Sequence, residues 1–309
     1  MIKHYHLFFI FLLFSWLTSS QEIKQFQVGD FDLRGNVKTC QVITDYGQEI
    51  FEFDDIGRLV KVTTQYNEDD KDITSYSFVS GNLVEKRVES YKDNVLDLSS
   101  SMAHFYTVDS TDNIKVKEQI ISYDKEFVEV QEYQFNEDSF LSKIMVSHED
   151  AVDEIIVEHT AYKDEKTKTY FENGIVQKSI RESIKKSKNR GALSVLLTKN
   201  YLDGEPNNAI EEIRDDQGLL ISKEVFNFDM EEKEFVSQEK HFLEYNEEGI
   251  LTKEIIKQGN ATAEKEYIFQ FDNNEEKNWV KKIITPENTF TTRRITYYPK
   301  AVANIEIPK

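Results

Sequence analysis

The stretch Phe51–Lys61, which reads FEFDDIGRLVK, decides the fold expected for this chain. Phe51 and Phe53 are two positions apart, so both rings project from one face of a β-strand. The two aspartates that follow favour a turn, and Gly57 tolerates the positive φ that such a turn needs. Leu59 then begins a returning strand. This order of aromatic pair, polar turn and aliphatic return predicts a β-hairpin.

Leu59 and Lys61 have the same parity in the returning strand, so the pattern predicts both on one face. We expect Leu59 to cover the rings across the ladder, and the stem of Lys61 to lie over a ring while its charge reaches water. Two further clear units repeat this order, and the last has a tryptophan at the aliphatic return. The residues that define them are Phe242, Tyr245, Gly249, Leu251, Lys253, Phe269, Phe271 and Trp279.

Degenerate copies of the unit follow one another at irregular intervals along most of the chain. Between them lie alternating runs rich in Thr, Tyr, Phe, Val and Ile, which are typical of antiparallel strands with one wet face. Because the intervals vary, a uniform solenoid is not expected. The sequence predicts an all-β protein, a repetitive antiparallel β-hairpin meander that forms an extended, twisted or curled sheet.

Four segments are expected along the chain. Residues 1–20 have a charged start, an apolar run and small residues before Gln21, which is the layout of a cleavable secretory signal. Residues 21–180 and 201–309 are expected to be two β-repeat halves. The stretch 181–200 between them is locally basic and has no aromatic pair, so it predicts a linker or short helix.

The composition of the chain limits the classes of partner that can be expected. The formal net charge is −19, and such a polyanion is repelled by phosphate backbones, so no nucleic-acid partner is expected. The single cysteine, Cys40, cannot form an internal disulfide, and we expect it to be a small strand residue. Aromatic residues make up 12% of the chain, which is too many for a disordered acidic tail.

Four segments resemble a known repeat family. They are FDDIGRLVK at 53–61, YNEEGILTK at 245–253, FDNNEEKNWVKKII at 271–284 and TTRRITYY at 291–298. Together they resemble the degenerate YD-type, RHS-like repeats of secreted bacterial proteins. The resemblance implies an exported antiparallel β architecture and, in some members, surface interaction. Strict Tyr-Asp pairs are mostly replaced here, and no toxin-like segment is appended, so encapsulation of a cargo is not expected.

Catalytic and metal-binding patterns are absent from the sequence, so no enzyme activity, cofactor or metal is predicted. No two histidines of the exported part lie close enough for a zinc motif. Asp272, Asn274 and Glu276 alternate like the start of a calcium loop, but Lys277 and Ile283 stand where Gly and Glu are needed. Acidic turns explain these residues without calcium.

The function predicted first is an exported non-enzymatic binding or scaffold protein of the cell envelope or surface, with an unknown protein or glycan as partner. One alternative is a carbohydrate-active envelope enzyme or glycan-binding accessory protein, with Trp279 as a sugar-stacking platform. A second is an outer-membrane β-barrel. Charged residues are 31% of the chain and occur on both parities of most strands, so no integral membrane segment is expected after signal cleavage. The predicted location is secreted, periplasmic or at the cell surface.

Overall fold

A computed structural model describes residues 25–148, 151–187 and 191–299, so the predicted signal at 1–20 lies outside the described residues. Twenty strands and one short 3-10 helix, η1 (Val28–Phe31), make up its regular structure. The strands are β1 (Val37–Thr44), β2 (Gly47–Phe53), β3 (Leu59–Gln65), β4 (Lys71–Val79), β5 (Asn82–Lys92), β6 (Val95–Asp109), β7 (Lys115–Ser122), β8 (Val128–Phe135), β9 (Leu141–Ser147), β10 (Val152–Tyr162), β11 (Glu165–Glu172), β12 (Ile175–Ser187), β13 (Gly191–Leu202), β14 (Glu205–Arg214), β15 (Leu220–Asp229), β16 (Glu234–Tyr245), β17 (Leu251–Gln258), β18 (Ala261–Phe271), β19 (Trp279–Thr285) and β20 (Thr289–Tyr297). No helix among the described residues is long and apolar enough to cross a bilayer.

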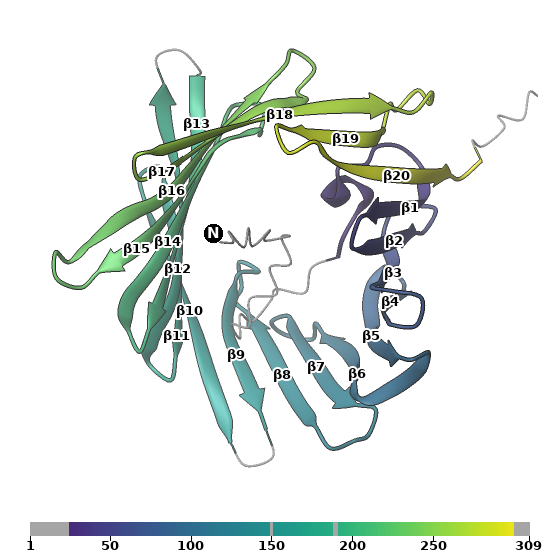
Figure 1. Ribbon diagram of the computed structural model, residues 1–309. Helices are drawn as coiled ribbons and strands as arrows, with labels where there is room; N and C mark the ends of the chain where they lie inside the picture. The colour runs from purple at the N-terminus through teal and green to yellow at the C-terminus, as the bar shows by residue number, and fades with distance from the viewer. Residues whose placement is uncertain (1–24, 149–150, 188–190, 300–309) are drawn as a thin grey trace, which may run out of the picture.

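The strands form one antiparallel sheet that closes on itself. Each strand pairs with the next along the chain, and β1 also pairs with β20, with Cys40 opposite Ile295. Figure 1 shows the resulting barrel, in which the first and last strands lie side by side. The predicted all-β antiparallel hairpin meander is confirmed, and its curled form is a closed barrel.

The basic stretch 181–200 is not a linker or a helix in its described part. Residues 175–187 belong to β12 and 191–202 to β13, and the two strands pair along ten positions. The physical reason is alternation: Ile180 and Ile184 lie on one face, while Arg181 lies on the other. The local excess of positive charge therefore marks a hairpin, and the sheet continues between the two predicted halves.

The inner face of the barrel is identified by η1, which lies inside the ring of strands (Figure 1). Val28 of η1 and the nearby Leu33 form a buried cluster with Phe53, Leu59 and Cys40. Directly paired residues of neighbouring strands share a face. The inner face can therefore be followed around the wall through the pairing register, and it also holds the second buried cluster, which centres on β7 to β10.

A recurrent β-bulge follows the turn of each clear unit. In the first unit Phe53 pairs with Leu59, but Glu52 pairs with Lys61, so Val60 is the extra residue. Leu59 consequently faces inward and Lys61 faces outward, where its ammonium lies 3.0 Å from Glu52. The prediction that Leu59 and Lys61 share a face was wrong because the bulge reverses the alternation between them.

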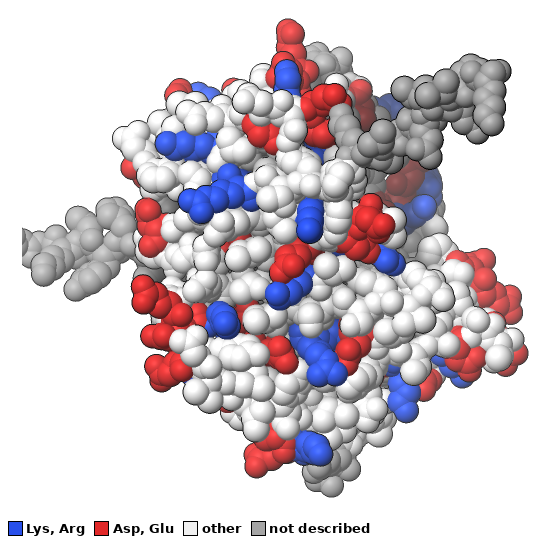
Figure 2. All heavy atoms as spheres, turned by 90° about the vertical axis from the view of Figure 1, so that its right-hand side faces the viewer, with Lys and Arg blue, Asp and Glu red and all other residues white. Residues whose placement is uncertain are grey.

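Ion pairs join neighbouring strands on the outer face. In each pair the basic residue is a neighbour in sequence of an inward-facing residue, so its own side chain points outward. The pairs are Lys61–Glu52, Lys143–Glu154, Arg181–Glu165, Lys240–Glu224 and Lys253–Glu264. Figure 2, which views the side of β1 to β5 and β20, shows basic and acidic side chains interspersed among uncharged ones.

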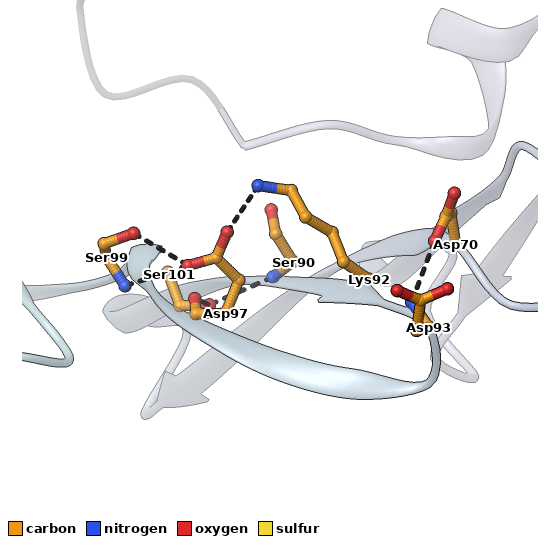
Figure 3. A network of polar contacts seen from close by, with 7 residues as sticks. All are labelled: Asp70, Ser90, Lys92, Asp93, Asp97, Ser99 and Ser101. Carbon is orange, nitrogen blue, oxygen red and sulfur yellow. Dashed lines mark hydrogen bonds and ion pairs between the residues drawn. The ribbon is translucent and has the colours of Figure 1, made fainter.

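A larger irregularity interrupts the pairing of β5 with β6. Val88 pairs with Met102 but Ser90 pairs with Asp97, so several residues of β6 have no direct partner there. Ser101, which is fully buried, closes the gap: its hydroxyl accepts from the Ser90 amide at 3.0 Å and donates to the Asp97 carbonyl at 2.6 Å (Figure 3). This side chain replaces the missing ladder bond.

The prediction that the exported chain has no integral membrane segment was wrong. It rested on the charged residues at both parities of the strands, which carry no information about closure, whereas the strands close into a barrel through the pairing of β1 with β20. A closed barrel satisfies its backbone hydrogen bonds between strands, and it is the architecture with which strands span a membrane.

Candidate functional site on the inner wall

A pocket of about 540 Å³ lies between the chain segment after η1 and the inner wall of β16 to β19. Asp32 and Arg34 form one side. Aromatic side chains dominate the other side, and they are Tyr245, Tyr267, Phe269, Phe271 and Trp279. The volume lies within the range of small-molecule sites, for which concave apolar walls with a few polar groups are typical.

The segment after η1 is fixed to the wall by side chains of β19 and of the turn before it. Asn278, only 2% exposed, accepts from the Arg34 amide at 2.8 Å and donates to the Arg34 carbonyl at 2.8 Å. The indole of Trp279 donates to Asp32 at 2.7 Å. These bonds fix that side of the pocket, so its shape is set before any ligand enters.

The aromatic wall follows from the repeat unit. Phe269 and Phe271 are two apart in β18 and face inward, and Phe271 pairs directly with Trp279. A bulge at Val280 of β19 sends the next paired residue of that strand, Lys281, to the outer face. Phe271 is 37% exposed, so its ring is available to a ligand.

Trp279 is part of the wall rather than a free platform. Its side chain is 8% exposed, and the guanidinium of Arg293 lies 3.5 Å from the centre of the ring. A sugar ring needs an open aromatic face for stacking. This geometry therefore does not support the interpretation of Trp279 as a sugar-stacking platform.

Positive charge gathers beside Trp279 on the inner face. The ammonium of Lys282 lies 5.4 Å from the centre of the Trp279 ring, near Arg293. Burial, and secondly the repulsion from Arg293, lowers the pKa of Lys282, while Asp32 opposes this change. Arg293 donates to the carbonyls of Phe31 and Asp32, but its buried Nε has no partner among the described residues. The carboxylate of Asp32 acts on both cations, and it is already bound by the indole of Trp279.

A polar triad lies beside the aromatic wall on three consecutive strands. His241 of β16 contacts Glu254 of β17 at 2.6 Å, and the hydroxyl of Tyr267 of β18 donates to the same carboxylate at 2.5 Å. These contacts hold Tyr267 in its place in the pocket wall. The hydrogen bond that His241 donates to Glu254 raises the pKa of His241 and lowers the pKa of Glu254.

The same triad occurs a second time on the inner wall. His104 of β6 contacts Glu118 of β7 at 2.7 Å, and Tyr133 of β8 donates to Glu118 at 3.0 Å. In both copies the histidine pairs with the residue two positions after the glutamate. Sequence reasoning missed both sets because it searched for histidines near one another, whereas the signal is one His, one Glu and one Tyr spread over three strands.

The predicted repeat residues fall into three places. Phe51, Phe53, Gly57 and Leu59 lie at the cluster around η1. Lys61, Lys253 and Phe242 lie on the outer face, where Lys240 and Lys257 contact the Phe242 ring. Tyr245, Gly249, Leu251, Phe269, Phe271 and Trp279 line the pocket. The structure therefore brings together the second and third units, and the first unit lies apart from them.

No group of residues in the described part of the chain has the composition and geometry of a metal site. Asp272, the first residue of the calcium-like alternation, accepts from the Asn274 amide at 3.3 Å and from the hydroxyl of Tyr297. These bonds belong to a turn. Cys40 is buried at 1% exposure, and burial raises the pKa of its thiol to about 11, as for an inert core residue.

Comparison with known proteins adds little to this geometry. No protein-family model and no curated protein sequence matches the chain. Among solved structures, the chain is similar to a porin-like protein from Bacteroides vulgatus ATCC 8482, with 8% sequence identity and a TM-score of 0.25, covering 85% of this chain and 98% of that one. At this identity and TM-score the likeness carries no argument about function. The resemblance to YD-type repeats stays a prediction.

Proposed function

We propose that this chain is a non-enzymatic β-barrel of the bacterial cell envelope that binds a small ligand in the inner-wall pocket between Arg34 and the aromatic residues of β16 to β19. The observation that carries the proposal is the convergence of those rings around a volume of about 540 Å³ with a side fixed by Asn278. The predicted signal at residues 1–20 supports the envelope location.

Two physical terms favour binding at this place. Apolar surface of the ligand that is removed from water when it packs against the rings contributes about 25 cal/mol per Å² to the free energy of binding. The anchored segment at Arg34 means that little of the wall must be ordered when the ligand enters, which keeps the entropic cost of binding low. Neither term requires a chemical step, which agrees with the absence of a recognisable catalytic pattern in the sequence.

The sole tryptophan of the exported chain gives a direct test. Trp16 lies within the predicted signal, so the chain from Gln21 contains only Trp279. We expect a bound ligand to shift or quench the Trp279 emission saturably. Phe271→Ala should weaken binding, and Phe242→Ala on the outer face is the matched control. Saturable binding that responds to Phe242→Ala and not to Phe271→Ala would place the site elsewhere.

An outer-membrane β-barrel is the second candidate, and closure of the sheet is the observation that favours it. In that placement the charged pairs of the outer face carry a cost, because Lys or Arg facing lipid at the bilayer midplane costs about 2–4 kcal/mol each. Fractionation of the native host decides between the two placements. A membrane-integral barrel stays in the membrane pellet after carbonate and urea washes and is shifted by heat on a gel, whereas a peripheral or free barrel is released.

A further inference from the structure

We propose that the pocket binds a small amphipathic monoanion, a carboxylate with an apolar body, and that Lys282 is the side chain that selects its charge. This inference rests on the proposed binding function and names the ligand class of the same pocket. It follows from the charge balance of the lining, from the place of Lys282 in the wall, and from the shape of the apolar part.

The lining has an excess of positive charge in a strongly acidic protein. The charged residues around the pocket are the cations Arg34, Lys277 and Lys282 and the carboxylates Asp32 and Glu248, which leaves one unbalanced positive charge. The whole chain has a net charge of −19. A single negative charge on the ligand balances the charged residues of this lining.

Lys282 is the cation built into the wall. It belongs to β19, it pairs with Phe269 of β18, and it therefore faces inward beside the rings. Among the described residues, none of the ion pairs involves Lys282, and its close charged neighbours are Arg293 and Asp32. Asp32 already accepts from the Trp279 indole and lies near both cations, so it balances only one of them. A ligand carboxylate supplies the missing partner.

One part of the wall fits an apolar body. Leu219, Leu251 and the rings of Phe269 and Phe271 line the same pocket as Lys282, and Phe269 pairs directly with it. A charged group at one place and an apolar surface beside it require a ligand with the same division. A sugar, which exposes hydroxyl groups on all sides, does not match this division.

The experiment compares three probes of one chain length: decanoate, decanol and decylamine. Binding to the exported chain is measured by calorimetry, because Lys282 contacts Trp279 and would change its emission directly. We expect decanoate to bind about tenfold more tightly than decanol, and decylamine more weakly than decanol, as a partly buried charge-assisted contact implies.

Two variants of the same strand assign the selection to one side chain. Lys282→Met should remove the preference of about tenfold for decanoate and leave decanol within about twofold, since the apolar wall is unchanged. Lys281→Met is the matched control, because Lys281 faces outward over the Phe290 ring and should alter neither affinity. Lys282→Arg keeps the charge and should keep the preference for decanoate. It is the variant to measure if Lys282→Met does not fold.

The outcomes separate this inference from the proposed function. Equal binding of decanoate and decanol, unaltered in Lys282→Met, would overturn the selection of an anion while leaving the pocket as a binding site. Tightest binding of decylamine would overturn it as well. If none of the three probes binds, both this inference and the binding function of the pocket are contradicted.

Discussion

At the scale of single residues, the pocket depends on a few buried polar groups rather than on its rings alone. Asn278 is 2% exposed and makes hydrogen bonds to the backbone of Arg34 and to Tyr297. An unpaired buried amide or carbonyl costs more than the bond itself contributes, because water cannot reach it. The segment at Arg34 is therefore expected to detach when this one side chain is removed.

Asn278→Ala should lower the free energy of unfolding by about 1–3 kcal/mol, since it leaves the Arg34 amide and carbonyl without partners. The same change should move the emission of Trp279 to longer wavelength, because the adjacent indole becomes hydrated. Asn273→Ala in the exposed part of the same turn is the control and should change neither quantity. An unaltered emission in Asn278→Ala would show that the segment is held by other contacts.

The triad at His241 makes the stability of the fold depend on pH. Its hydrogen bond to Glu254 raises the pKa of His241 above the ordinary value of 6.5, so the contribution of the protonated ring is complete below that value and is lost as the pH rises through the raised pKa. The pKa of Glu254 is lowered from 4.5, so its contribution is lost only as the pH falls through that lowered value.

His241→Gln should therefore destabilise the protein most between the two transitions, in mildly acidic solution, and progressively less as the pH rises above 6.5. Urea unfolding of both chains over a pH series measures this difference. His148→Gln, at a half-exposed histidine, is the control. A difference that grows with rising pH would have the opposite sign to the one expected.

At the scale of secondary-structure elements, the hairpins could be predicted because their information is local. In FEFDDIGRLVK the alternating rings, the turn residues and the aliphatic return lie within eleven consecutive residues, Phe51 to Lys61. The turn residues are typical of a hairpin with a bulge, but the position of the bulge at Val60 was missed because it depends on the pairing of Glu52 with Lys61, which periodicity alone does not reveal. The β12 to β13 hairpin was misjudged because its charge was weighed above the alternation of Ile180 and Ile184.

The gap in the β5 to β6 pairing gives a prediction at this scale. Ser101→Ala removes the acceptor of the Ser90 amide and should lower the free energy of unfolding by about 1–3 kcal/mol. Ser99→Ala, whose exposed hydroxyl only donates to the side chain of Asp97, should cost less. Hydrogen exchange should become faster at the Ser90 amide in Ser101→Ala. Equal effects of the two changes would mean that the buried hydroxyl does not replace the ladder bond.

At the scale of the whole molecule, neither the closure of the barrel nor the position of the pocket could be predicted from the sequence. The pairing of β1 with β20 joins residues from opposite ends of the chain, and no local pattern encodes that contact. The pocket depends on the same long-range contacts, since Arg34 meets Asn278 only after the barrel closes. The sequence predicted the aromatic members of the site other than Tyr267 as repeat residues, but not that they share a pocket with Lys282.

Closure is the claim on which the inner wall, the pocket and its charge selection depend. It is tested most directly by Thr39→Cys with Thr296→Cys in a Cys40→Ser background, because these threonines are paired across β1 and β20 with their hydroxyls 2.6 Å apart. Oxidation should give a monomeric disulfide that runs as a compact species on a non-reducing gel. Thr39→Cys with Thr169→Cys on β11 is the control and should stay reduced. Failure of the first pair to form an intramolecular disulfide, or equal bonding of the control pair, would contradict a closed barrel.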